Sequence, residues 1–197
     1  MNTAMIGAFL LLAVPAFFTP GPNNLMLMTS TARFGVARTL PHAIGIVVGF
    51  PFMVFVVALG LGEVFAAFPA LKLVLKYLAA AYLLWMAWNL LGLRIGEGET
   101  RERPLRPHEA ILFQWINPKG WVMATSLAAA FVSTGPDRLF SVAAITLGCL
   151  VLSPLSTGLW MLFGESLQAF LKKTGTERFL GAVLALLMVA AVIMFFI

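Results

Sequence analysis

The chain has 197 residues, of which 61% are hydrophobic and only 11% are charged. A soluble domain carries about 25% charged residues, so this composition indicates an integral membrane protein. The 13 basic residues are scattered over short connections and form no basic stripe, which argues against nucleic-acid binding. A single cysteine, Cys149, and two histidines exclude an internal disulfide, a CxxC redox pair and a Cys/His metal site, so no metal or other cofactor is expected.

Six hydrophobic segments follow one another, each close to the roughly 20 residues that a helix needs to cross a bilayer. They lie at about residues 4–32, 40–62, 69–93, 109–134, 139–164 and 178–197. We therefore expect an all-α membrane protein with six transmembrane helices in a single polytopic domain, residues 1–197. The connection at about residues 94–108 is the only one that has the length and composition of a loop.

Two of these segments are interrupted by proline. The sequence TPGPNN (residues 19–24) interrupts the first, and NPKG (residues 117–120) interrupts the fourth, 98 residues later by the spacing of Pro20 and Pro118. Proline removes an amide donor and clashes with the preceding turn, and unpaired backbone groups are costly in hydrocarbon. Helices 1 and 4 are therefore expected to be broken at TPGPNN and NPKG, where protein or water satisfies the freed groups. The two breaks predict a cavity.

The two breaks also align the halves of the chain. With Pro20 opposite Pro118, Gly49 falls opposite Gly148 and Tyr77 opposite Phe179, at offsets of 99 and 102 residues. Each half then holds three segments: repeat one at about 1–93 and repeat two at about 109–197, joined by the loop. An odd number of crossings inserts the halves in opposite senses, which is the inverted-repeat plan of many secondary transporters.

Basic residues set the expected orientation, because Lys and Arg are retained on the cytoplasmic side. The first, third and fifth connections hold nine of them: Arg33, Arg38, Arg94, Arg101, Arg103, Arg106, Lys172, Lys173 and Arg178. The second and fourth connections hold three: Lys72, Lys76 and Arg138. The remaining one, Lys119, lies inside a segment. This distribution places the 94–108 loop in the cytoplasm and both termini outside.

The breaks also carry the candidate site. Asn117 followed by Pro118 is typical of a helix start, and Pro22, Asn23 and Asn24 can start a second helix in the same way, the asparagines capping it and contacting a ligand. Helix starts in mid-membrane present bare amides that favour a carboxylate.

Lys119 adds a full positive charge to these helix starts, unless it lies near the interface and snorkels. A substrate ammonium would then depend on free carbonyls near residues 16–18 and 114–116.

Other polar and small residues have weaker signals. His42, beside Pro41 at the cytoplasmic end of the second segment, is a candidate for proton coupling, although an interfacial histidine is the commoner case. Gly45 and Gly49 have the small-xxx-small spacing of closely packed membrane helices, inside the protomer or across a homodimer. No Asp or Glu lies in the middle of a segment, which argues against a carrier for metal cations.

Several stretches resemble the LysE/RhtB family of bacterial amino-acid exporters: FFTPGPNNLMLMTSTARFGVARTLPHAIGIVVGF, YLAAAYLLWMAWNL and FQWINPKGWVMA. The resemblance covers nearly the whole chain. It implies a secondary transporter that exports amino acids or close derivatives across the bacterial inner membrane, driven by the proton gradient. The pattern is similar to the branch that exports cysteine and O-acetylserine, and also to homoserine and threonine exporters.

The family motifs fall on the two breaks. The substrate-binding residues predicted from the breaks and the resemblance together are Pro20, Gly21, Pro22, Asn23, Asn24, Asn117, Pro118 and Lys119. Their expected partner is a small amphoteric molecule such as an amino acid. The alternatives are an exporter or channel for another small solute or a metal ion, or an intramembrane enzyme or assembly subunit without transport activity. No catalytic constellation is visible, so we expect no enzyme.

Overall fold

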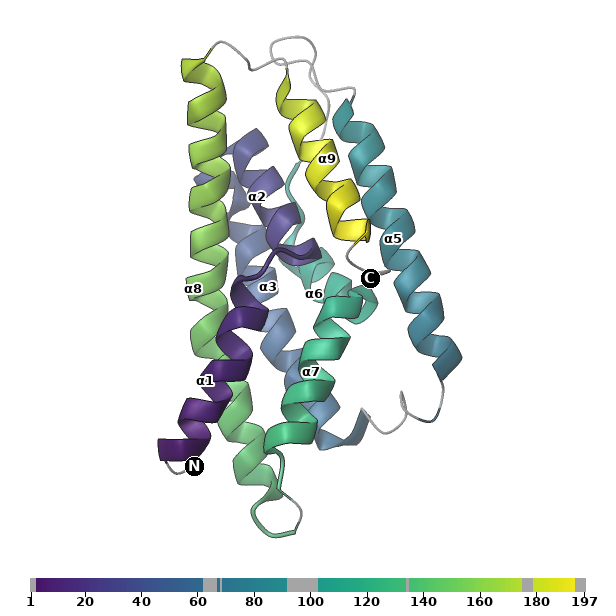
Figure 1. The fold of residues 1–197 in the computed structure, drawn as a ribbon, viewed down its shortest axis with the longest axis vertical. Coiled ribbons are helices and arrows are strands. Elements are labelled where there is room, and N and C mark those ends of the chain that lie inside the picture. Colours follow the sequence, from purple (N-terminus) through teal and green to yellow (C-terminus); the bar gives the residue numbers. More distant parts are fainter. Residues whose placement is uncertain are drawn as a thin grey trace.

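The structure is a computed structural model that describes residues 3–61, 67, 69–91, 103–133, 135–174 and 179–193. Its regular elements in these ranges are all helices, which confirms the all-α class (Figure 1). They are α1 (Thr3–Phe18), α2 (Pro22–Phe34), α3 (Val36–Val56), the π-helical turn η1 (Val57–Leu61), α5 (Pro69–Leu91), α6 (Pro107–Ile116), α7 (Pro118–Phe131), α8 (Arg138–Lys173) and α9 (Leu180–Ile193).

These helices follow the six predicted segments in order. α1 with α2 covers the first segment, α3 with η1 the second, and α6 with α7 the fourth. One prediction is wrong: α8 continues to Lys173, whereas the fifth segment was expected to end near residue 164. The stretch after Gly164 mixes polar and apolar residues and contains neither glycine nor proline, so the helix continues after its mainly apolar part ends. Most of the predicted loop, residues 94–102, lies outside the described residues.

Within the described ranges, two helices are long and apolar enough to cross a membrane: Val36–Gly60 and Arg138–Phe170. A third span results if Ala4–Phe18 and Pro22–Phe34, which are bent by 47° at their junction, are counted together. Gly181–Ala190 is a shorter apolar helix.

Two apolar clusters hold the helices together. One gathers side chains of α2, α5 and α9, such as Leu27, Leu83 and Leu184, and the other gathers side chains of α1, α3, α7 and α8, such as Ala13 and Ile145. Figure 1 shows α8 running the length of the molecule beside α1, α2 and α3, with α5 and α9 side by side at the other edge. The junctions of α1 with α2 and of α6 with α7 lie near mid-height, between the two clusters.

Small residues allow the closest helix contacts. A Cβ added at Gly45 would lie 2.5 Å from the Pro107 carbonyl oxygen, and one added at Gly49 would lie 2.9 Å from Cα of Ile111. The small-xxx-small spacing therefore does pack α3 tightly, against α6 of the same chain, as predicted. Gly164 of α8 lies equally close to the backbone of α2.

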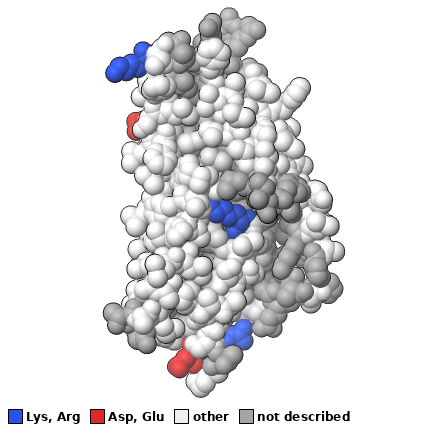
Figure 2. Space-filling view, viewed as in Figure 1, with Lys and Arg blue, Asp and Glu red and all other residues white. Residues whose placement is uncertain are grey.

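Charged side chains on the face drawn in Figure 2 lie mainly toward the two ends of the molecule. A basic group near the middle of this face is the exception. The rest of this face between the ends is formed by uncharged residues where the structure describes it, and many large apolar side chains of the described helices, such as Leu11, Trp88 and Val151, are exposed. This distribution is suited to lipid around the middle and water at both ends.

Candidate functional site

At the first break, the chain turns between the end of α1 at Phe18 and the start of α2 at Pro22. Gly21 is the N-cap of α2, in an extended conformation, and Pro22 follows at the first helical position. The expectation that Asn23 and Asn24 cap the start of α2 is wrong. Asn24 instead turns back to α1, and its amide donates to the carbonyls of Phe17 and Thr19, both at 2.9 Å. The Phe17 carbonyl lies in the last turn of α1 and the Thr19 carbonyl just after it, where helical donors are missing.

At the second break, Asn117 separates α6 from α7. Its side-chain oxygen accepts a hydrogen bond from the Lys119 amide at 3.1 Å, and Pro118 occupies the first helical position of α7. This is the helix start that the sequence predicts. Asn117 is 2% exposed, so the cap is buried.

Two sets of hydrogen bonds join the breaks. The Lys119 ammonium donates to the Thr19 carbonyl at 2.8 Å, to the Thr19 hydroxyl at 3.0 Å and to the Pro20 carbonyl at 3.2 Å. The Asn23 amide donates to Gln114 Oε1 at 2.7 Å, and Gln114 Nε2 returns a bond to Asn23 Oδ1 at 3.3 Å. Stretches almost 100 residues apart in the sequence therefore form one polar site.

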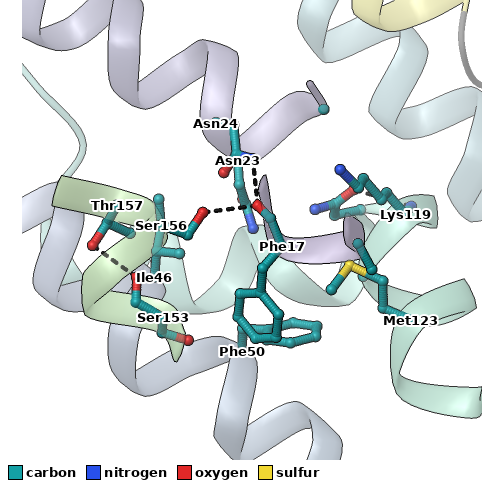
Figure 3. A pocket seen from close by; sticks show the side chains of 14 residues that line it. Phe17, Asn23, Asn24, Ile46, Phe50, Lys119, Met123, Ser153, Ser156 and Thr157 are labelled. Atoms are coloured by element: carbon teal, nitrogen blue, oxygen red, sulfur yellow. Dashed lines mark hydrogen bonds between the residues drawn. The ribbon is translucent and has the colours of Figure 1, made fainter. Parts of the chain in front are cut away.

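A cavity of about 40 Å³ lies where the breaks meet (Figure 3). By volume it holds only a few water molecules. Figure 3 shows hydroxyls of α8 on one side, Lys119 and Met123 of α7 on the other, and the rings of Phe17 and Phe50 at one end. It is lined by Ala16, Phe17, Gly21, Asn23, Asn24, Ile46, Phe50, Asn117, Lys119, Gly120, Met123, Ser153, Ser156 and Thr157.

Most residues predicted for the site lie at this cavity. Five of them line it: Gly21, Asn23, Asn24, Asn117 and Lys119. The prolines, Pro20, Pro22 and Pro118, shape the two turns beside it. His42 belongs to a different place: it is 1% exposed in α3, and its Nδ1 lies 3.1 Å from the Ser30 hydroxyl of α2.

Sequence reasoning missed several polar groups at the site. Gln114 is fully buried and pairs with Asn23, while Ser153, Ser156 and Thr157 line the cavity from α8. A usable signal was present, because Gln114 is a polar amide inside an apolar segment and the three hydroxyls share one helix face at spacings of three and four.

Several of the carbonyls expected to bind a substrate ammonium already have protein donors. The Phe17 carbonyl accepts from Asn24 and, at 2.8 Å, from the Ser156 hydroxyl. The Trp115 carbonyl accepts from the Trp121 indole at 2.9 Å. A substrate ammonium would therefore have to replace a protein donor at the oxygens of the first break. Lys119 is the donor that carries the same positive charge as an ammonium.

The model of the LysE-type translocator family matches residues 14–197, which include both breaks and the cavity. The chain belongs to this family. Among its relatives are the cysteine/O-acetylserine efflux proteins of Escherichia coli strain K12 and Shigella sonnei strain Ss046. Each is 25% identical to this chain over 197 residues, and the match covers all of both proteins. The protein of the same name from Escherichia coli O139:H28 is 24% identical over the same length. No solved structure gives a significant match.

Membership in the LysE family shows what kind of protein this chain is. LysE-type proteins are translocators, so this chain is a transporter and not an enzyme. Its long apolar helices and lipid-compatible surface fit a multi-pass membrane protein.

Proposed function

We propose that this LysE-family chain is a secondary transporter that exports a small amino acid, or a close derivative, across the bacterial inner membrane. One observation carries the proposal: two helix starts and the Lys119 ammonium meet at one cavity in the middle of an apolar helical molecule. The relatives named cysteine/O-acetylserine efflux proteins support a substrate of this size and charge. The proposed site residues are those predicted from the sequence at the two breaks, together with Gln114.

The cavity matches both charges of an amino acid. The first turn of a helix leaves amides without helical partners, and Asn23, Asn24 and Gly120 form such turns at the cavity. These amides and Lys119 suit a carboxylate. The oxygens of Thr19 and Pro20, which now hold the Lys119 ammonium, suit the substrate ammonium.

Substrate binding then works by exchange at Lys119. A carboxylate near α7 attracts the Lys119 ammonium away from Thr19 and Pro20, and the substrate ammonium takes the oxygens that Lys119 leaves. An ammonium occupies these oxygens in both states, so neither state leaves a buried ammonium without hydrogen-bond acceptors. The exchange also enlarges the cavity, because the Lys119 side chain fills the space beside Gly21, where a Cβ would lie 2.6 Å from Lys119 Cδ.

The inverted repeat expected from the sequence is part of this proposal. Gly49 of α3 packs on α6, the first half of the second broken pair, and Gly148 of α8 packs on Phe9 of α1, the first half of the other pair. These two glycines are opposite each other in the sequence alignment of the halves. α5 and α9, the last helices of the two halves, pack against each other. Contacts that cross between halves in matching pairs support a pseudo-two-fold arrangement of six spans.

The proposed orientation places both termini outside. α2 ends with Arg33 in its last turn and α8 ends with Lys172 and Lys173, and in Figure 1 these ends lie at the opposite end of the molecule from the N-terminus. Basic residues gathered at one end support assigning that end to the cytoplasm. A homodimer stays a prediction from the sequence.

We also propose His42 as the proton-coupling residue. It lies on the same stripe of α3 as Ile46 and Phe50, two residues of the cavity wall, at spacings of four. Its ring contacts the Ser30 hydroxyl of α2. A buried imidazole one turn from the cavity can change its charge as the site opens to either side.

Counterflow tests the proposed function. Purified protein is reconstituted in proteoliposomes preloaded with one unlabelled amino acid, and uptake of the same labelled compound is measured for a panel headed by cysteine and O-acetylserine. We expect transient accumulation above equilibrium for at least one small amino acid, which protein-free liposomes lack. Absence of counterflow across the panel, from folded protein, would contradict amino-acid transport.

The proposed role of His42 has its own test. The variant His42→Asn should keep counterflow and lose uptake driven by an imposed pH gradient.

A further inference from the structure

Ser153 is an unusual hydroxyl in this molecule. It is 1% exposed, lines the cavity, and its Oγ has no hydrogen-bond partner among the described residues. Several other helical hydroxyls bond to a carbonyl four residues earlier, as Thr146 does to Val142 and Thr157 does to Ser153, and the only other buried hydroxyl without a partner among the described residues is that of Thr29. A buried polar group without a partner is costly in a membrane protein, and such groups call for an explanation.

The position of Ser153 gives that explanation. Its neighbour on the same face of α8, Ser156, donates to the Phe17 carbonyl and so completes the first break. Ser153 lies one turn earlier, and Figure 3 shows it toward the end of the cavity where the rings of Phe17 and Phe50 lie. The charged part of the site, Lys119 and the helix starts, lies apart from this end. An amino acid whose charged groups bind at the breaks therefore directs its side chain toward Ser153.

We infer that Ser153 selects the substrate by the polar atom of its side chain. The transported class is then small amino acids whose side chain carries an oxygen or a sulfur, such as a hydroxyl, a thiol or an ester, over isosteres that end in a methyl group. Ser153 donates to, or accepts from, that atom, which gives its hydroxyl a hydrogen-bond partner. Phe17 and Phe50 limit the size of the side chain and keep water from Ser153. This inference rests on the proposed function.

Competition in counterflow tests the selection. Half-inhibitory concentrations are measured for serine and for cysteine, each against 2-aminobutyrate, the isostere of both that ends in a methyl group, on wild type and on Ser153→Ala. One hydrogen bond corresponds to roughly a tenfold preference, so wild type should favour serine and cysteine by about tenfold. Ser153→Ala should bring both ratios to about one, or below it, and should leave the inhibition by 2-aminobutyrate intact.

Ser156→Ala is the matched control, because it makes the same change on the same helix at the same cavity. Its hydroxyl already has a protein partner, and the Phe17 carbonyl keeps its bond from Asn24. Ser156→Ala should therefore retain the preference for serine and cysteine, even if its counterflow rate differs from that of wild type. Ser153→Ala should also unfold at no lower temperature than wild type, since its hydroxyl has no bond to lose.

The outcomes distinguish a failure of the role of Ser153 from a failure of the proposed transport function. Counterflow with an unchanged preference in Ser153→Ala would overturn the role of Ser153 and leave the proposed function standing. A lower unfolding temperature of Ser153→Ala would also overturn it, because the hydroxyl would then have a structural partner. Failure of counterflow in wild type would overturn the proposed function and the inference with it.

Discussion

Lys119→Met is expected to reduce counterflow about a hundredfold or more while the protein stays folded and abundant in the membrane. The ammonium makes three hydrogen bonds to the first break, and in the exchange described above it pairs with the substrate carboxylate. Hydrogen bonds to a charged group are worth about 1.5–3 kcal/mol each, and about 2.8 kcal/mol corresponds to a hundredfold. Methionine matches the lysine side chain as far as Cε and lacks only the ammonium, so most of the packing beside Gly21 is retained. Initial counterflow rates at equal protein density measure the effect.

Lys172→Met is the control for this substitution. Lys172 is exposed in the last turn of α8, far along the helix from the residues that line the cavity. The same loss of charge there should change the counterflow rate less than about twofold. If Lys119→Met transports as fast as Lys172→Met, Lys119 takes no part in substrate binding.

Gly164→Ala, which adds one methyl group, is expected to lower the free energy of unfolding by more than about 2 kcal/mol. A Cβ at Gly164 would overlap the Met28 carbonyl and lie 2.9 Å from Cβ of Thr31. Both belong to α2, whose backbone cannot move without shifting Asn23 and Asn24 at the cavity. Overpacking costs typically 1–3 kcal/mol even where flexible side chains can adjust. Thermal unfolding in detergent should show a clear fall in Tm.

Gly158→Ala makes the same change on α8, six residues earlier. A Cβ there has nothing within 4 Å, so only the backbone preference remains. Alanine is favoured over glycine in a helix interior by about 0.5–1 kcal/mol, and Tm should therefore rise or stay level. Equal Tm values for the two variants would show that α2 and α8 are not packed as described.

The helix ends near Pro20, Pro22 and Pro118 could be located from sequence because proline acts locally. The residues around these prolines place helix ends without any knowledge of the partners, and α1, α2, α6 and α7 end or begin there. The packing of Gly45 and Gly49 was also predictable as a close contact, although the sequence left open whether the partner was another helix of the chain or a second protomer. α8 shows the limit of this reasoning, since hydrophobicity marks where a helix leaves the bilayer and not where it ends.

The contacts that assemble the site could not be predicted, because they join residues far apart in the chain. Asparagine near a helix start normally caps it, but Asn24 is drawn back to the free carbonyls of α1 and Asn23 to Gln114 of the other break. The unpartnered hydroxyl of Ser153 depends on the register of α8 against α1 and α3, which apolar periodicity does not fix. Hydroxyls at such spacings pack against helix backbone in most membrane proteins.

Substrate protection of a cysteine in the cavity tests most directly that the substrate binds where the two breaks meet. Met123→Cys would be labelled with a small thiol reagent in a Cys149→Ala background, because Met123 lines the cavity and the single native cysteine is buried elsewhere. Ser166→Cys, at an exposed position near the end of α8, serves as the reference.

The amino acid that gives the strongest counterflow should slow labelling of Met123→Cys at least about fivefold at saturation, as expected for a site occupied most of the time. It should leave labelling of Ser166→Cys unchanged. A labelling rate at Met123→Cys that does not respond to saturating substrate would contradict a binding site between the breaks.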